Sequence, residues 1–456
     1  MTGTHTIAAL ATAPGMGAIA VLRLSGPDAV TIADTVFKSV SHKKLKDQPS
    51  HTVHLGHIFD GQSMVDEVLV SVFKAPHSYT GENVVEISCH GSTYIQQKLL
   101  QLLMDKGATM AEAGEFTLRA FLNGKMDLTQ AEAVADLIAS EGEAAHRMAI
   151  QQMRGGISDR LSELRAQLVD FASLIELELD FSEEDVAFAD RKALEKLLDN
   201  IQITLKSLLD SFALGNAMKN GVPVAIAGKP NAGKSSLLNA LLQEEKAIVS
   251  DIPGTTRDSI EDTLYVDGIQ FRFTDTAGLR ETQDKIEAIG VERAKDKIAQ
   301  SQYLLYVVDP TQTHADDVQK ALDALKNNNI QIWVVINKMD LLSEKQMRNY
   351  AASLKPPHLF ISAHSKRGLD TLKQQLSEAV QGQSFDTIIT NNRHYAILKQ
   401  ALQSTLAVRQ GLSEGLSSDL LAIDLRDTLN HLGTVTGTVS TDELLGNIFA
   451  NFCIGK

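Results

Sequence analysis

The sequence of 456 residues predicts a multidomain protein that combines an α/β domain with an α+β domain and a helical domain. The length fits about three domains rather than one. An apolar run at 222–227, followed by a glycine-rich loop and a helix start, is typical of an α/β unit. Apolar residues spaced three to four apart predict amphipathic helices on both sides of this unit. These helices are expected at 157–181, 193–212, 392–408 and 418–432.

Residues 1–120 mix short β-like runs with turns and are expected to form the α+β domain. Its candidate elements are strands at 6–12, 18–24 and 84–88 and a helix at 92–106 that Gly107 closes.

The two helical segments predict one domain that another domain interrupts. Residues 121–218 and 383–456 would form the helical domain, and residues 219–382 would be the inserted α/β domain. Insertion is well tolerated when the termini of the inserted domain lie close together.

The composition narrows the classes of function. With 57 acidic and 43 basic residues, the net charge is −14, so any nucleic-acid partner must meet a local basic patch or be held jointly with another protein. No N-terminal signal pattern appears, and no apolar run approaches the roughly 18 residues needed to span a bilayer. Two cysteines, Cys89 and Cys453, are too few for a disulfide framework. We therefore expect a cytoplasmic protein with no membrane association.

The glycine-rich loop, Gly228–Ser235, fits the phosphate-binding pattern G-x-x-x-x-G-K-[ST] in the strand–loop–helix context that this motif requires. Its backbone N–H groups and the helix N-terminus would attract phosphate. Lys234 would reach the β- and γ-phosphates, and the Ser235 hydroxyl would ligate Mg²⁺. The loop predicts nucleotide binding.

A second motif indicates that the base is guanine. Asn337-Lys338-Met339-Asp340 follows an apolar run and fits N-K-x-D, in which the Asp340 carboxylate can accept two N–H bonds from the guanine edge. Ser362-Ala363 fits the companion loop that supports the base. The order and spacing of the motifs predict a Ras-like P-loop GTPase domain.

The switch elements are expected between these motifs. Asp275-Thr276-Ala277-Gly278 would hold Mg²⁺ through water and sense the γ-phosphate, and Thr256 in the polar loop 254–258 would ligate Mg²⁺. Leu279 stands where Ras-like enzymes place the glutamine that orients the attacking water. Two interpretations remain open: a slow GTPase that acts as a timer, or one in which other groups position the water, with Asn231 helping to bind a monovalent cation.

The C-terminal segment 452–456 places Cys453 fourth from the end, as in a prenylation box, but a terminal lysine and the lack of a polybasic stretch argue against lipidation. The segment is either a buried structural tail or one that delivers Cys453 or Lys456 to a site.

Together these features resemble the MnmE (TrmE) family of tRNA-modification GTPases over the whole chain. The GTPase motifs alone would fit many translation-factor-like proteins, whereas the tail and the N-terminal segments are specific. The segments that carry the resemblance are Thr6-Ile7 with Ala13-Pro14-Gly15, Leu22-Arg23-Leu24-Ser25-Gly26, Tyr79-Thr80-Gly81-Glu82, Gly114-Glu115-Phe116-Thr117, Arg119-Ala120-Phe121-Leu122-Asn123-Gly124-Lys125 and the tail Cys453-Ile454-Gly455-Lys456.

The resemblance implies that the N-terminal domain is similar to tetrahydrofolate-binding domains and dimerises the protein. It also implies that the homodimer joins an MnmG-like FAD protein in a heterotetramer. This complex would add an aminomethyl or carboxymethylaminomethyl group at carbon 5 of the tRNA wobble uridine. The one-carbon donor would be 5-formyltetrahydrofolate or another tetrahydrofolate, held by Arg23, Glu82, Lys125 and Lys456. Cys453 is the tail residue implicated in the chemistry.

The resemblance also bears on the missing glutamine. It implies that K⁺ binds beside the phosphates, held by Asn231, Ser250, Ile252 and Thr255, and that Glu287 orients the attacking water. The motifs and the resemblance together predict these GTP contacts: Asn231, Ala232, Gly233, Lys234, Ser235, Ser236, Ser250, Asp251, Ile252, Pro253, Gly254, Thr255, Thr256, Asp275, Thr276, Ala277, Gly278, Asn337, Lys338, Asp340, Ser362 and Ala363.

Two other functions are compatible with parts of the sequence. A ribosome-assembly GTPase would act as a binding switch without one-carbon chemistry, and the folate-like N-terminal segments and Cys453 argue against it. A folate-dependent transferase whose GTPase is only regulatory cannot be separated from the first interpretation by sequence.

Overall fold

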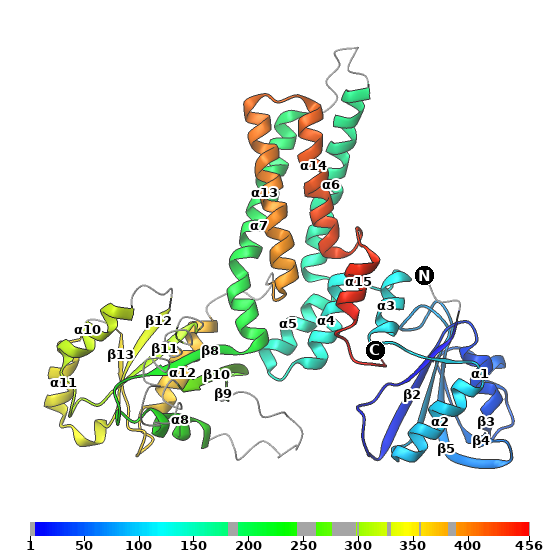
Figure 1. Ribbon diagram of the computed structural model, residues 1–456, viewed down its shortest axis with the longest axis horizontal. Helices are drawn as coiled ribbons and strands as arrows, with labels where there is room; N and C mark the ends of the chain where they lie inside the picture. Colours follow the sequence, from blue (N-terminus) through cyan, green and yellow to red (C-terminus); the bar gives the residue numbers. More distant parts are fainter. Residues whose placement is uncertain are drawn as a thin grey trace, which may run out of the picture. The chain divides into compact units, whose positions relative to one another are not determined.

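The computed structural model describes residues 5–180, 190–243, 261–275, 298, 301–325, 330–354, 357–381 and 389–455. The chain divides into two compact units (Figure 1). The first comprises Met1–Ala139, Ala149–Lys206 and Ala396–Lys456, and the second comprises Ser140–Met148 and Ser207–Tyr395.

The N-terminal part of the first unit is built on a seven-stranded sheet with the order β3-β4-β5-β6-β2-β1-β7. Its strands are β1 (Ile7–Leu10), β2 (Ile19–Ser25), β3 (Phe37–Ser39), β4 (Thr52–Asp60), β5 (Ser63–Phe73), β6 (Val84–His90) and β7 (Thr109–Met110). Helices α1 (Ala29–Val36) and α2 (Thr93–Asp105) share a buried apolar core with the sheet, which includes Leu22, Val70 and Leu99. The strands expected at 6–12, 18–24 and 84–88 and the helix expected at 92–106 are confirmed as β1, β2, β6 and α2.

The other face of the sheet exposes apolar side chains where β4 pairs with β5. Val53, Leu55 and Leu69 are 62%, 47% and 46% exposed, and Leu55 lies directly opposite Leu69. We name these three residues the apolar strip.

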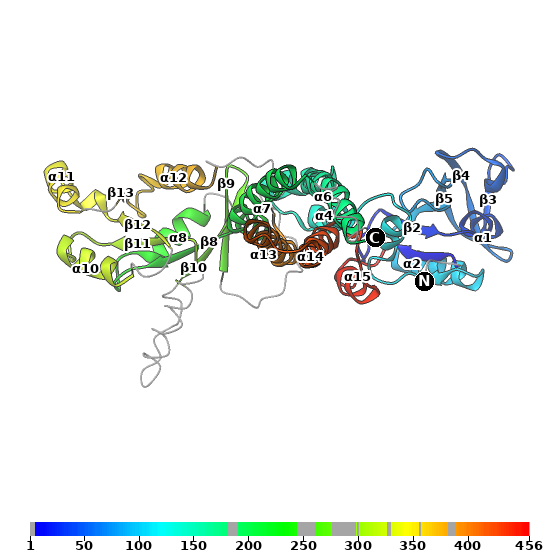
Figure 2. The ribbon, with the colours of Figure 1, turned by 90° about the horizontal axis from the view of Figure 1, so that it is seen from above.

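The helices of the first unit come from both ends of the chain. They are α3 (Glu115–Leu122), α4 (Leu128–Ala139), α6 (Gly156–Asp180), α13 (Asn392–Glu414), α14 (Ser418–Thr436) and α15 (Asp442–Phe449), together with parts of α5 (Glu143–Met153) and α7 (Arg191–Asn220). Figure 2 shows α6, α7, α13 and α14 side by side, viewed along their axes. Ion pairs join them across the sequence, with nitrogen–oxygen distances of 2.8 Å between Arg426 and Glu176 and 3.0 Å between Arg409 and Asp199. The expected helical segments are therefore confirmed as helices that pack together.

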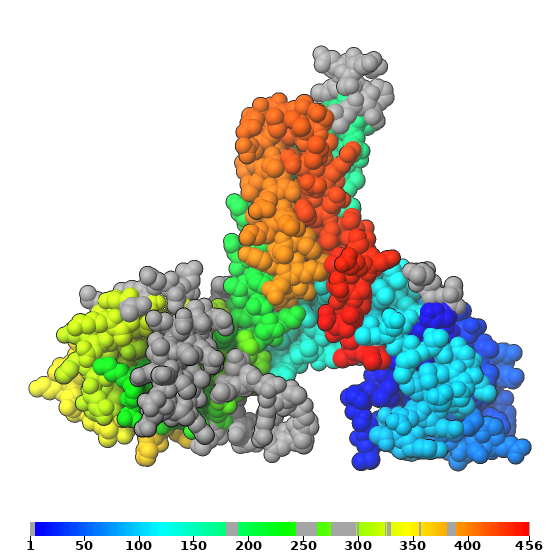
Figure 3. Space-filling view, viewed as in Figure 1, coloured from blue at the N-terminus to red at the C-terminus, as the bar shows by residue number. Residues whose placement is uncertain are grey.

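The C-terminal segment packs against the start of the helical region. Phe449 and Phe452 share an apolar cluster with Leu128, and Figure 3 shows this segment lying against the surface of α3 and α4. Ile454 forms a β-bridge with Ala113.

The second unit contains a six-stranded sheet with the order β13-β12-β11-β8-β10-β9, in which only β9 is antiparallel to its neighbour. The strands are β8 (Val222–Ala227), β9 (Glu261–Val266), β10 (Ile269–Asp275), β11 (Tyr303–Val308), β12 (Gln331–Ile336) and β13 (His358–Phe360). Helices α8 (Lys234–Gln243) and α12 (Leu369–Gln381) pack in one apolar core, and α10 (Ala315–Leu325) packs in a second one. Helix α11 (Glu344–Ala352) contributes Tyr350 to the second core. This arrangement confirms the predicted α/β unit.

Residues from well upstream also belong to the second unit. The backbone N–H of Ala144 donates to the carbonyl of Gly268 at 3.1 Å, in the turn between β9 and β10. The Glu141 carboxylate accepts hydrogen bonds from Tyr265 at 3.1 Å and from Gln270 at 3.2 Å. Because Ala144 and Met148 are buried in the same core as the sheet, this short segment is part of the α/β unit.

Candidate nucleotide-binding site

The glycine-rich loop lies between the end of β8 and the start of α8, and its glycines are required by geometry. Gly228 has φ +147°, and a Cβ atom there would lie 2.1 Å from the carbonyl oxygen of Val307. Gly233 has φ +95°, and a Cβ atom there would lie 2.2 Å from Nδ2 of Asn337. Any larger residue would displace neighbouring backbone or the asparagine, so the sequence must use glycine at both positions.

The end of the loop and the first turn of α8 provide hydrogen-bond donors. The Lys234 ammonium donates to the carbonyls of Gly228 at 2.9 Å and Lys229 at 3.0 Å. Ser235 and Ser236 are exposed in the first turn of α8, and Asn231 is exposed with a left-handed φ of +62°. A helix N-terminus with a lysine and two hydroxyls beside it favours phosphate oxygens and a hydrated divalent cation.

Asn337 joins three parts of the site. It is 3% exposed, its Nδ2 donates to the Ala232 carbonyl at 3.0 Å, and its Oδ1 accepts from the Ala363 backbone N–H at 3.0 Å. Its own backbone N–H donates to the Val308 carbonyl at 2.8 Å. One side chain therefore fixes the phosphate loop against the loop that carries Ser362 and Ala363.

Replacing Asn337 by alanine is expected to loosen both loops. The Ala232 carbonyl and the Ala363 N–H would lose their partners, and each unsatisfied buried group costs about 1–3 kcal/mol. We expect the melting temperature to fall by about 5 °C or more and GDP affinity to fall with it. Thermal unfolding and GDP titration of the variant measure both effects.

Asn349 is a matched control, because it is exposed on α11. Asn349→Ala should leave both quantities unchanged. If Asn337→Ala behaves like this control, the side chain does not join the loops.

The second loop borders a cavity of about 630 Å³ that continues to the phosphate loop. A hydrogen bond from Ser362 and nearby cationic groups hold the pKa of the Asp340 carboxyl below its usual value. The exposed carboxylate is therefore ionised at neutral pH and can accept N–H groups from a ligand in the cavity. The residues that line the cavity are Gly233, Ser236, Asn239, Ala240, Asn337, Lys338, Asp340, Leu341, Ser362, Ala363, His364 and Lys366.

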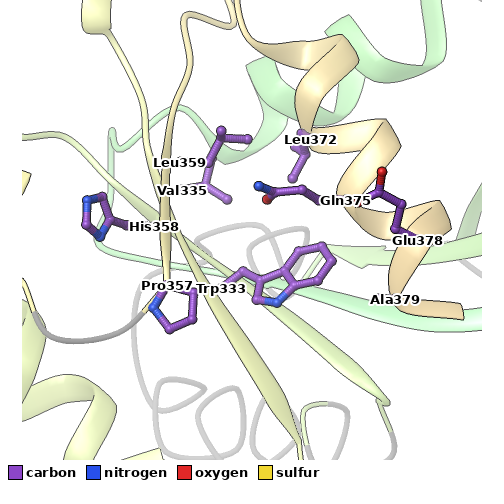
Figure 4. Close-up of a pocket in the computed structure, with 9 residues that line it drawn as sticks. All are labelled: Trp333, Val335, Pro357, His358, Leu359, Leu372, Gln375, Glu378 and Ala379. Carbon is purple, nitrogen blue, oxygen red and sulfur yellow. The ribbon is translucent and has the colours of Figure 1, made fainter. Parts of the chain in front are cut away.

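A second cavity in this unit, of about 450 Å³, has different chemistry. Figure 4 shows it between strands β12 and β13 and helix α12, with the indole of Trp333 beside Gln375 and Glu378. None of the described residues that line it is a lysine, an arginine or a glycine. The first cavity, which adjoins the glycine-rich loop, is therefore the better candidate for a nucleotide.

Many of the predicted switch and cation residues lie outside the described part of the chain. These are Ser250, Asp251, Ile252, Pro253, Gly254, Thr255, Thr256, Thr276, Ala277, Gly278 and Glu287. Asp275 is described as the last residue of β10, where its backbone lies opposite Ile226 of β8. Asp275 is therefore on the strand next to β8, and the phosphate loop begins where β8 ends.

A second cluster of predicted site residues lies in the first unit. The Arg23 guanidinium pairs with Glu86 at 2.8 Å and lies over the rings of Tyr79 and Phe116, at 5.5 and 5.7 Å from their centres. Its Nη1 also points toward the Gly455 carbonyl, at 3.5 Å. Arg23 therefore meets the C-terminal tail, although Lys456 lies outside the described residues.

Glu82 lies in the loop before β6, and Lys125 lies in the separate loop between α3 and α4. Glu82 accepts from the Ser25 hydroxyl at 2.7 Å and from Arg119 at 3.2 Å. The Lys125 ammonium donates to the Pro76 carbonyl at 3.1 Å, and its stem lies 3.4 Å from where a Cβ on Gly81 would stand. Arg119 is 4% exposed and was not among the predicted site residues. Its position as a basic residue in one of the N-terminal segments that carry the family resemblance could have indicated it.

Cys453 has an exposed side chain. The tail is held instead by its backbone, because the Cys453 carbonyl accepts from the Gly114 N–H at 3.4 Å. Phe452 before it is buried. The tail is therefore held by its backbone and by the buried Phe452 side chain, and the Cys453 thiol is exposed.

Among the residues that the structure places, no group of three or more histidine, cysteine, aspartate or glutamate side chains could hold a metal ion. The described helices include none that is long and apolar enough to cross a membrane.

Comparison with known proteins gives two family matches. The model of the MnmE helical domain matches residues 128–453, and that of the GTP-binding protein TrmE N-terminus matches residues 6–125. Similar curated proteins, both called tRNA modification GTPase MnmE, include one from Flavobacterium johnsoniae (55% identity, 100% of both chains) and one from Bacteroides thetaiotaomicron (50% identity, 99% of both chains). Among solved structures, Aquifex aeolicus Era with GDP and AlF₄⁻ is 28% identical over 40% of this chain and 66% of its own, with a TM-score of 0.28.

Proposed function

The chain belongs to the MnmE family of tRNA-modification GTPases, and from this premise we propose that its GTPase cycle is K⁺-dependent and drives modification of carbon 5 of the tRNA wobble uridine. Together with an FAD-dependent MnmG-like protein, it adds an aminomethyl or carboxymethylaminomethyl group. The observation that supports the GTPase activity is the cavity that runs from the glycine-rich loop to Asp340. One cavity is lined both by the loop that would bind phosphate and by the carboxylate that would read guanine.

The described residues fit a Mg²⁺–GTP complex. A Cβ at Gly228 or Gly233 would collide with neighbouring atoms, as expected where a backbone curls around phosphate. Lys234 would hold the β- and γ-phosphates, and Ser235, with Thr256 from the switch loop, would ligate Mg²⁺. Bound Mg²⁺ supplies charge neutralisation at the phosphates. Asp340 reads the guanine edge, and Ser362 holds that carboxylate in place.

The K⁺ site is proposed on the exposed amide of Asn231 at the edge of the loop. Ser250, Ile252 and Thr255 would complete it, and Glu287 would orient the attacking water. This assignment replaces the absent glutamine, because Leu279 offers no polar group. K⁺ would supply positive charge beside the transferring phosphoryl group.

GTP hydrolysis is expected to be at least about tenfold faster in K⁺ than in Na⁺ at equal ionic strength. An increase of this size is expected because one well-placed positive charge can accelerate phosphoryl transfer by at least this factor. The cation must fit its site to stabilise transition-state charge. Asn231→Ala should remove most of the difference. Initial rates of phosphate release in the two salts test this, and equal wild-type rates would exclude a K⁺-selective site.

We place the one-carbon site in the N-terminal part of the first unit, which would be similar to tetrahydrofolate-binding domains. Arg23 and Lys125 would pair with the carboxylates of 5-formyltetrahydrofolate or a related folate, and Glu82 would accept from its pterin ring. Lys456 would join them, a proposal that the approach of Gly455 to Arg23 supports. The GTPase domain would be inserted in the helical domain, which the packing of α6 against α14 supports.

The protein would act in the cytoplasm as a homodimer that joins two copies of the FAD partner in a heterotetramer. The apolar strip supports the dimer proposal, because exposed apolar residues on a sheet commonly mark an interface. The net charge of −14 supports joint holding of tRNA with the partner.

Reconstitution tests the proposed function. The purified chain, the FAD partner, unmodified tRNA, GTP and a tetrahydrofolate donor should together form modified uridine. Omitting GTP, the folate or this chain should each prevent it. Full modification without GTP or without this chain would refute the proposal.

A further inference from the structure

Asp309 is a buried carboxylate that no sequence motif assigned. It follows the last residue of β11 and is 3% exposed. Its Oδ1 accepts from the Thr311 backbone N–H at 2.9 Å and from the Thr311 hydroxyl at 2.6 Å. Its Oδ2 accepts from the Lys338 ammonium at 2.5 Å. A buried charge is unfavourable unless it is paired and hydrogen-bonded, and this one is both.

The local contacts keep the group charged. Burial raises the pKa of Asp309, but hydrogen bonds from Lys338 and Thr311 outweigh this effect and the pKa lies below its usual value. The Asp309 carboxylate is therefore ionised at neutral pH.

Lys338 reaches from the cavity to this carboxylate. Its backbone has a left-handed φ of +60°, and its side chain lines the cavity of about 630 Å³ that also contains Asp340. The ammonium end is fixed by Asp309, while the residue itself belongs to the loop that reads the base. A lysine stem has many rotamers, and a strong ion pair at its tip restricts them.

We propose that Asp309 is a positioning residue for nucleotide recognition. By holding the Lys338 ammonium, it keeps the methylene stem stretched along the cavity wall as a fixed apolar surface for the face of a purine. This inference rests on the proposed guanine site. It adds Asp309 to that site as the group that fixes Lys338 against the face of the base, while Asp340 reads the edge of the base.

This division of roles has a measurable consequence. The face of the base is nearly the same in guanine and in hypoxanthine, but hypoxanthine lacks the 2-amino group that Asp340 would accept from. Loss of the ion pair should therefore weaken GDP and inosine diphosphate by the same factor. Loss of the Asp340 carboxylate should reduce the preference for GDP over inosine diphosphate.

The test compares the dissociation constants of both nucleotides by titration of the full-length protein. Asp309→Asn keeps the shape and the acceptor for Thr311 but loses the charge, and it should raise both constants equally, by roughly tenfold, as for loss of one charge-assisted hydrogen bond. Asp316→Asn, which alters an exposed carboxylate in the first turn of α10, is the matched control and should change neither constant. Unchanged constants for Asp309→Asn, or a changed ratio between the nucleotides, would overturn the inference.

A double-mutant cycle separates positioning from general stability. Lys338→Met retains an apolar chain but leaves Asp309 buried without its partner. If Asp309 acts through Lys338, adding Asp309→Asn to Lys338→Met should not weaken GDP binding further. If Lys338→Met alone does not fold, the double variant is compared with Asp309→Asn instead, and the two should bind GDP equally. An equal loss in both backgrounds would overturn the inference.

The same titrations separate this inference from the guanine assignment. If Asp340→Asn changes the ratio between the nucleotides and Asp309→Asn changes nothing, only the positioning role fails. If the wild type does not prefer GDP to ADP, the guanine site itself fails.

Discussion

Asp340→Asn is expected to bind GTP roughly 100-fold more weakly than the wild type, because a charge-assisted acceptor is lost and an amide donor is placed against the donors of guanine. The variant should gain relative affinity for xanthine nucleotides, whose carbonyl at position 2 can accept from the new amide. Ser362 holds the Asp340 carboxyl in its ionised form, so the contrast is between a charged acceptor and a neutral amide. Titration with GTP and xanthosine triphosphate measures the exchange of preference.

Asp370 provides the matched control, since it is an exposed carboxylate in the first turn of α12 and is not part of the cavity lining. Asp370→Asn should bind both nucleotides as the wild type does. Unchanged GTP affinity in Asp340→Asn would remove this residue from base recognition and leave the cavity without a guanine reader.

Cys453→Ser is expected to abolish or sharply reduce wobble-uridine modification while GTP binding and hydrolysis remain normal. Serine is a far weaker nucleophile and proton donor than a thiol. The exposed thiol and the backbone anchoring of the tail predict that the fold tolerates the change. Modified-uridine content and melting temperature are measured on the same variant.

Cys89 separates chemistry from packing. It is 3% exposed, and burial raises the pKa of its thiol to about 11, so it is a structural residue. Cys89→Ser should lower the melting temperature and reduce modification only in proportion to lost protein. If Cys453→Ser shows that same pattern, or is stable with normal modification, Cys453 has no role in the chemistry.

The elements with a strong local pattern could be predicted from sequence. The apolar run at 222–227 forms β8, and the segment 157–181, where apolar residues are three to four apart, corresponds to α6. The docking of Glu141 and Ala144 on the β9–β10 turn could not be predicted, because they are more than a hundred residues away and no local periodicity encodes that contact. The apolar strip was missed for a related reason, since only register shows that Leu55 and Leu69 share an exposed face.

The nucleotide site shows the same limit. The glycine-rich loop and N-K-x-D were identifiable because their chemistry fixes residue types at short spacing. The bond from Asn337 to Ala232 crosses between motifs, and Asp309 belongs to neither of them. Its role depends on where β11 ends relative to Lys338, which only the folded sheet determines.

Mass spectrometry of wobble uridines in tRNA from cells that lack this chain shows directly whether the chain takes part in tRNA modification. The carbon-5 modification should disappear in these cells and return when the wild-type gene is restored. It should not return with Asp340→Asn at GTP concentrations too low to fill the site of this variant. Unchanged modified uridine in the deleted cells, with the chain found instead on immature ribosomal subunits, would contradict the account and favour a ribosome-assembly GTPase.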